Sequence, residues 1–152
     1  MGWRLKRTSQ CAKCPWRKDV DPREIPDGYS EEKHRKLAST IAQEGDITGM
    51  LSGRLAIMAC HESHDAHCLG WLMNQLGPGN NIALRMHVRS CDNLRSVRLA
   101  GEQHERFQDT LPGDTVECDN CGKQIAEEDI VSHPMAPVIC CRSCMEDGDP
   151  RR

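Results

Sequence analysis

The spacing of its ten cysteines constrains this chain of 152 residues more than any other feature. Six of them form three C-x-x-C pairs, at residues 11 and 14, 118 and 121, and 141 and 144. Leu, Ile, Val and Phe together supply only 26 residues, below the roughly 20 % at which a chain begins to lack the apolar material for folding by burial alone. The net charge of −3 is too small for the self-repulsion of a disordered chain. The sequence therefore predicts a fold held together by disulfides or by metal.

The cellular compartment decides between these two kinds of cross-link. The first residues, MGWRLKR, contain no apolar segment of the kind found in secretory signals, and no run approaches the roughly 18 apolar residues of a membrane span. We therefore expect a cytoplasmic protein with no membrane partner. Closely paired cysteines in a reducing compartment are more often metal ligands or redox groups than structural disulfides. Metal is thus the favoured cross-link.

A breaker cluster, Leu-Pro-Gly-Asp at 111–114, divides the chain where the cysteine spacing changes. We expect a cysteine-rich, mainly helical metal-binding domain over residues 1–111 and a zinc-ribbon or treble-clef-like finger over residues 112–152. The predicted fold class is a small, metal-stabilised α+β protein.

Apolar spacing and capping residues predict four helices in the first domain. Ser30 is the expected N-cap of a helix running to about Glu44, and residues 66–76 keep helical spacing up to the breaker Gly-Pro-Gly at 77–79. A third helix is expected after Asn80 or Asn81, and a last one over roughly 94–109. Residues 50–59 are apolar, but no period in them distinguishes a strand from a helix.

The last two C-x-x-C pairs, with 19 residues between them, predict a zinc site. Each pair makes a tight knuckle with two thiolates, and two knuckles complete a tetrahedron. Gly122 fits this interpretation because the residue after a knuckle often needs a positive φ. Cys140 is one residue out of register and is interpreted as a spare buried thiol. The predicted ligands are Cys118, Cys121, Cys141 and Cys144.

This finger resembles that of the DksA/TraR family, which binds RNA polymerase. The resemblance covers about 30 residues and implies a four-ligand finger with a structural or protein-docking role. The coiled coil that precedes the finger in that family has no counterpart here, so its mechanism in the polymerase channel is not implied. The shared positions are Cys118, Gly122, Ile125, Pro137, Cys141 and Cys144.

A second metal site is predicted in the first domain, where the cysteines follow C-x2-C-x45-C-x7-C. Four thiolates accept either Zn²⁺ or an iron–sulfur cluster, and zinc is favoured because the full cysteine spacing of ferredoxin-type sites is missing. His61 is the alternative ligand that replaces one cysteine, whereas Cys91 is interpreted as a small buried thiol. We thus expect two zinc ions in the whole protein. The predicted ligands of this site are Cys11, Cys14, Cys60 and Cys68.

Three motifs in this domain, C-x-x-C-P-W-R at 11–17, M-x-C-H at 58–61 and C-x-G-W at 68–71, are together similar to a family of uncharacterised small proteins common in bacteriophages and their hosts. The resemblance covers residues 11 to about 85. It implies a phage-encoded protein in the cytoplasm of a bacterial host and a metal-bound fold, without a known activity. Trp16 and Trp71 stand beside the ligands, and we expect them to cover the site rather than to stack on nucleobases.

Charge is distributed unevenly, because residues 1–18 carry six basic side chains and no acid, whereas residues 102–152 have a net charge of −7. An acidic finger repels phosphates, so nucleic acid would be bound at the front of the chain. The negative net charge and the scarcity of aromatic residues favour a host or phage protein as the partner over nucleic acid. The candidate nucleic-acid contacts are Arg4, Lys6, Arg7, Lys13, Arg17 and Lys18.

Three classes of function fit these features. The favoured class is a non-catalytic, zinc-binding regulatory or adaptor protein that binds a macromolecule of the transcription machinery or another host protein. A metal-dependent nucleic-acid enzyme would have to use the cluster of His61, Glu62, His64 and Asp65, but a four-cysteine zinc site leaves no open position for catalysis. A thiol or iron–sulfur redox protein would use Cys11 with its neighbour three residues on, but no βαβ pattern surrounds that pair.

Overall fold

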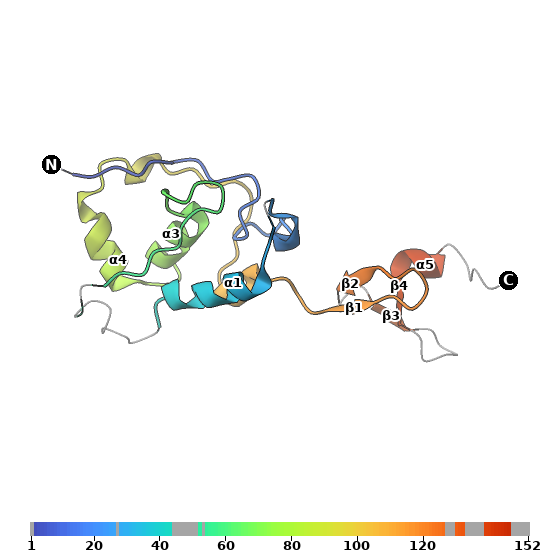
Figure 1. Ribbon diagram of the computed structural model, residues 1–152. Helices are drawn as coiled ribbons and strands as arrows, with labels where there is room; N and C mark the ends of the chain where they lie inside the picture. Colours follow the sequence, from blue (N-terminus) through green and yellow to red (C-terminus); the bar gives the residue numbers. More distant parts are fainter. Residues whose placement is uncertain are drawn as a thin grey trace. The chain divides into compact units, whose positions relative to one another are not determined.

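The computed structural model describes residues 2–26, 28–43, 52, 54–126, 130–132 and 139–146. The chain divides into two compact units, unit 1 (Met1–Pro112) and unit 2 (Gly113–Arg152), each with a hydrophobic core of its own. Figure 1 shows short helices in unit 1 and two small sheets in unit 2. The fold is therefore small and of the α+β class. Within the described part of the chain, no helix has the length and apolar character to cross a membrane.

Unit 1 consists of short helices and 3₁₀ turns joined by irregular chain. The prediction of a mainly helical domain therefore overstates its helix content. The longest of the α-helices in its described part has eight residues. In chain order the elements are η1 (Pro22–Glu24), α1 (Glu31–Lys36), η2 (Leu37–Thr40), α3 (Leu69–Leu76), α4 (Ile82–His87), η3 (Val88–Ser90), η4 (Leu94–Ser96) and η5 (Phe107–Thr110).

Two helices begin where the capping residues predicted. The Ser30 side chain accepts a hydrogen bond from the Lys33 N–H at the start of α1, and the Asn81 side chain accepts one from the Leu84 N–H at the start of α4. Both caps satisfy backbone donors that a helix leaves unpaired at its first turn. The first helix is shorter than predicted, because it tightens into η2 after Lys36 and ends at Thr40. Residue 44, its expected end, lies outside the described residues.

The helix predicted over 94–109 is wrong. Only the short turns η4 and η5 form there, and the chain between them is irregular, with isolated bridges at Arg98 and Gln103. Its backbone groups bond to the N-terminal segment instead: the Gln10 N–H donates to the Arg98 carbonyl at 3.0 Å, and the His104 N–H donates to the Trp16 carbonyl at 2.8 Å. Long-range pairing thus takes the hydrogen bonds that a helix would have used internally.

In the apolar stretch at 50–59, residue 52 is helical and residues 54–58 are irregular. Residues 50, 51 and 53 lie outside the described part of the chain. Ala59 then forms an antiparallel bridge with His67. The Cys68 N–H donates to the Met58 carbonyl at 2.9 Å, so the chain doubles back on itself here.

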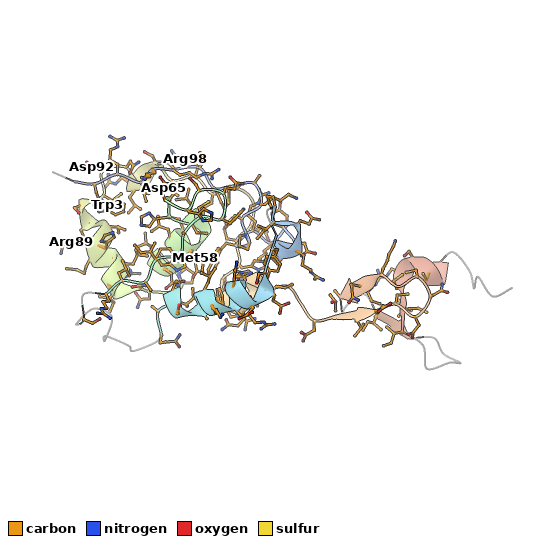
Figure 2. All side chains as sticks on the ribbon, viewed as in Figure 1. Trp3, Met58, Asp65, Arg89, Asp92 and Arg98 are labelled. Carbon is orange, nitrogen blue, oxygen red and sulfur yellow. The ribbon has the colours of Figure 1, made fainter. Side chains whose placement is uncertain are left out.

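The core of unit 1 gathers around α3. Trp71 and Leu72 on this helix are fully buried, together with Trp16 and with Leu84 from α4. Met58, labelled in Figure 2, is also buried in the interior. Four cysteines belong to the same buried cluster: Cys11, Cys14, Cys60 and Cys68.

Unit 2 contains two antiparallel hairpins and a short helix. Strand β1 (Thr115–Glu117) pairs with β2 (Gln124–Ala126), and β3 (Ile130–Ser132) pairs with β4 (Ile139–Cys141). Helix α5 (Arg142–Glu146) follows β4 directly. Among the described residues of this unit the buried core cluster has three members, Cys118, Ile125 and Cys141. Two of the three are cysteines, so this described core contains little apolar material besides Ile125.

Candidate metal centres

The four predicted ligands of unit 2 converge on one point. Their sulfur atoms all lie within 4.8 Å of one another. The turn between β1 and β2 supplies the first pair, and the end of β4 with the first turn of α5 supplies the second. The four residues are Cys118, Cys121, Cys141 and Cys144.

Backbone geometry explains how the first pair turns. The Gly122 N–H donates to the Cys118 carbonyl at 2.8 Å, and Gly122 has a φ of +70°. That value lies in the left-handed region, which glycine enters without the steric cost of a Cβ. The predicted role of Gly122 is confirmed. Cys140 is buried on β4 opposite Val131 and does not belong to the four-sulfur group.

The surroundings of these sulfurs favour thiolates. N–H groups of Cys141 and Cys121 point at the Cys118 sulfur and lower the pKa of Cys118 to about 6. The Ser143 hydroxyl lies 3.2 Å from the Cys141 sulfur and lowers the pKa of Cys141. A hydrogen bond to Cys141 raises the pKa of Cys144 to about 12. Two of the four sulfurs are therefore readily ionised, as metal ligation requires.

The distances fit a metal rather than a disulfide. All ten cysteines are free, and the sulfurs of Cys121 and Cys141 lie 3.7 Å apart. Zinc–sulfur bonds of about 2.3 Å in a tetrahedron place neighbouring sulfurs about 3.8 Å apart, whereas a disulfide requires about 2.05 Å. The group in unit 2 is thus positioned to bind a metal ion.

The cysteines of unit 1 lie close together in a different grouping from the predicted one. The ligand atoms of Cys11, Cys60 and His61 lie within 4.8 Å of one another, and the Cys11 sulfur is 3.9 Å from His61 Nδ1. Cys14 pairs with Cys68, with 3.9 Å between their sulfurs. His61, which the sequence offered only as an alternative, therefore stands in the three-residue group.

Hydrogen bonding joins the two parts of this grouping. The thiols of Cys11 and Cys68 both donate toward the Cys14 sulfur and lower the pKa of Cys14 to about 3. The same interaction raises the pKa of Cys11 and of Cys68. Cys14 thus interacts with the sulfurs of both Cys11 and Cys68, and its side chain is completely buried.

Close packing of α3 holds Cys14 near Cys68. Gly70 lies two residues after Cys68, and a Cβ at Gly70 would overlap the side chain of Trp16 and would lie 3.0 Å from the Cys14 sulfur. Only a residue without a side chain permits this approach. Trp16 and Trp71 have no exposed surface. Both tryptophans therefore belong to the same buried cluster as the cysteines, and neither offers an exposed stacking surface.

A buried, unpartnered nitrogen marks this site as well. His61 Nε2 is buried without a hydrogen-bond partner among the described residues. Such groups are uncommon in folded proteins and call for an explanation. Binding of a metal through Nε2 would supply one, since the other ring nitrogen, Nδ1, already faces the Cys11 sulfur.

The carboxylates near His61 are engaged elsewhere. Glu62 pairs with Arg7 at 2.8 Å, and Asp65 pairs with Lys6 at 2.5 Å. His64 is exposed. The cluster proposed for a nucleic-acid enzyme therefore does not form a group of metal ligands within the described chain.

Most of the N-terminal basic block is neutralised locally. Besides Lys6 and Arg7, three of its members pair with acids: Lys13 with Glu24, Arg17 with Asp19, and Lys18 with Glu102. Arg4 is exposed and has no ion pair among the described residues. Five of the six candidate nucleic-acid contacts thus already form an ion pair with a carboxylate of the same chain.

The fold and its two groups define a small α+β protein with two cysteine-rich groups positioned to bind a metal ion. The chain belongs to a family of unknown function, DUF6283, which it matches over residues 6–142. This match includes both units and nine of the ten cysteines, and it extends far beyond residues 11–85. Comparison with curated proteins and with solved structures found no match.

Proposed function

We propose that this protein is a non-catalytic, zinc-stabilised regulatory or adaptor protein that binds a macromolecule. The convergence of four cysteine sulfurs in unit 2 carries this proposal. A tetrahedral zinc ion with four protein ligands has no open position for water or substrate, which is the signature of a structural site. The role of the metal is then to hold a surface in shape, and the function belongs to that surface.

The arrangement of unit 2 supports a treble-clef-like finger. A knuckle in the β1–β2 turn supplies two ligands, and the second hairpin leads into α5, so that Cys141 at the end of β4 and Cys144 on α5 supply the other pair. The apolar core is too small to hold this arrangement alone. Zinc contributes about 10–16 kcal/mol of apparent binding free energy in finger peptides, which is enough to fold such a unit.

The grouping in unit 1 supports a second zinc ion. Three ligand atoms, from Cys11, Cys60 and His61, already lie in mutual reach, and the Cys14–Cys68 pair lies beside them. The donor set is compatible with three cysteines and His61 or with four cysteines. Mixed sulfur and nitrogen donors favour zinc over an iron–sulfur cluster, which is held chiefly by cysteines.

Metal analysis with one cysteine variant and a matched control tests this proposal. We expect two zinc equivalents in the wild type and one in Cys121→Ser, because the finger loses a ligand. Cys140→Ser removes a buried thiol from the same unit but not from the four-sulfur group, so it should keep both equivalents. Broad visible absorption together with bound iron would identify an iron–sulfur cluster, in place of zinc, in unit 1. Protein that folds fully without metal would refute the proposal.

A further inference from the structure

Four exposed arginines between residues 82 and 98 have no carboxylate partner among the described residues. Backbone carbonyls hold two of them. Arg85 donates from Nη2 to the Leu76 carbonyl at 2.9 Å, and Arg98 donates from Nη1 to the carbonyls of residues 95 and 97, each at 3.0 Å. These bonds orient a guanidinium group without cancelling its charge. The four residues are Arg85, Arg89, Arg95 and Arg98.

The N-terminal segment adds a fifth arginine to this surface. It runs parallel to the later segment, with bridges from Trp3 to Cys91 and from Ser9 to Arg98. Leu5 between these bridges is buried, and its neighbour Arg4 is exposed. Figure 1 shows the two segments side by side, and Figure 2 shows Arg98 at the top of the unit, Trp3 and Asp92 toward its left end, and Arg89 below them on the left side. We call Arg4 and the four arginines above the arginine face.

Charge is concentrated on this face. Residues 82–98 contain one acid, Asp92, which is exposed and leaves a net charge of +3 over the segment. By contrast, the remaining positive charges near the N-terminus are paired with acids. The arginine face is therefore a surface of unpaired positive charge on a protein whose net charge is −3.

We propose that the arginine face binds the phosphate backbone of nucleic acid, an inference that rests on the proposed function as a binding protein and names its partner. A guanidinium fork matches phosphate oxygens in a bidentate manner, and all five free cations of the face are arginines. Arg85 and Arg89 are four residues apart across α4 and η3, so they project from one side of this helical stretch. More than one phosphate can therefore be contacted together.

Trp3, the aromatic residue of the N-terminal segment, already packs against two histidine rings. The Trp3 ring lies 5.6 Å from that of His67 and 4.9 Å from that of His87, and its Nε1 donates to the His87 carbonyl. No free stacking platform is thus present among the described residues. Binding should depend on the backbone, with little preference for base sequence.

Fluorescence anisotropy with a labelled 20-base-pair DNA duplex tests the proposal on the zinc-loaded full chain. We expect binding that weakens about a hundredfold between 50 and 200 mM salt, because roughly four phosphate contacts give a salt slope of about −3.6. Arg85→Gln, Arg89→Gln, Arg95→Gln and Arg98→Gln in one chain should abolish most of that slope. An RNA duplex of the same sequence shows which nucleic acid is preferred.

A matched quadruple variant distinguishes the contribution of the arginine face from a general effect of the protein's net charge. Arg23→Gln, Arg35→Gln, Lys36→Gln and Arg106→Gln remove the same charge from exposed residues that have carboxylate partners. Affinity and slope should stay close to wild type. Equal losses in both variants, or no binding to either duplex at 50 mM salt, would overturn the proposal, as would binding of polyglutamate in place of nucleic acid. Zinc content, measured on the same samples, reports separately on the proposed function.

Discussion

His34 is a buried histidine with a hydrogen-bond partner at each of its ring nitrogens. It is buried at 5 % exposure between Tyr29 and Thr110. The Thr110 hydroxyl donates its single proton to the Phe107 carbonyl at 2.7 Å, so it accepts from His34 Nε2. The other ring nitrogen, Nδ1, then accepts from the Tyr29 hydroxyl at 2.9 Å. His34 is therefore held neutral, with both nitrogens satisfied.

This network makes the stability of unit 1 depend on pH. Burial, with help from the Arg35 charge, lowers the pKa of His34 to about 4, whereas an unfolded histidine has a pKa of about 6.5. The unfolded chain binds more protons between these values, so stability is complete above pH 6.5 and is lost as the pH falls toward 4. We expect His34 to account for about 2 kcal/mol of lost stability between pH 7 and pH 5.

Urea unfolding of the wild type and of His34→Gln at both pH values measures this contribution. The variant should lose less stability on acidification, and metal release is common to both proteins, so it cancels in the difference. His64→Gln, at an exposed histidine, should retain the wild-type pH dependence. Identical pH profiles for His34→Gln and wild type would contradict the argument.

At the scale of the element, α3 connects the core of unit 1 to its cysteines. It starts directly after Cys68, buries Trp71 and Leu72, and places Gly70 against Trp16. An alanine normally stabilises a helix interior by about 1 kcal/mol relative to glycine. At this position the added methyl group has no space, so the sign should reverse.

We expect Gly70→Ala to destabilise unit 1 by about 1–3 kcal/mol, the usual cost of overpacking, and to lower its metal content. Thermal unfolding and metal analysis check both effects. Gly113→Ala is the control, because no atom lies within 4 Å of a Cβ there; its stability should change by less than about 0.5 kcal/mol. A Gly70→Ala protein as stable as wild type would show that the helix can shift away from Trp16.

At the scale of the whole molecule, the two units differ in how far they depend on metal. Unit 1 has a buried cluster with Trp16, Trp71, Leu72 and Leu84 in addition to its cysteines. Unit 2 buries Ile125 as the one member of its described core that is not a cysteine. Removing metal should therefore affect the two units unequally.

Amide hydrogen exchange before and after treatment with a chelator tests this expectation. Unit 2 should lose all protection, because too little apolar surface remains to oppose chain entropy. In unit 1, the loss should concentrate near residues 11–17 and 58–68, while α3 and α4 retain protection. Protected amides in β1 and β2 of metal-free protein would show that unit 2 folds without its ion.

Interactions between sequence neighbours were sufficient to predict several features of this fold. Ser30 and Asn81 cap helices because a short polar side chain satisfies a nearby N–H, and Gly122 has a positive φ because a knuckle requires it. Within each C-x-x-C pair of unit 2 the two sulfurs lie close together, since a knuckle is a property of four consecutive residues. All of these features depend on neighbours in the sequence, and they are therefore predictable from it.

Features that depend on long-range pairing required the tertiary structure. The helix expected over 94–109 is absent because residues 98 and 104 bond to the N-terminal segment. The same pairing places Arg4 beside the segment 91–98. The positive charge of residues 82–98 is concealed by the net charge of −3 of the whole chain. In unit 1, His61 joins Cys11 because the chain doubles back between Met58 and Cys68. Such contacts join residues about 50 to 90 positions apart, and no local pattern encodes them.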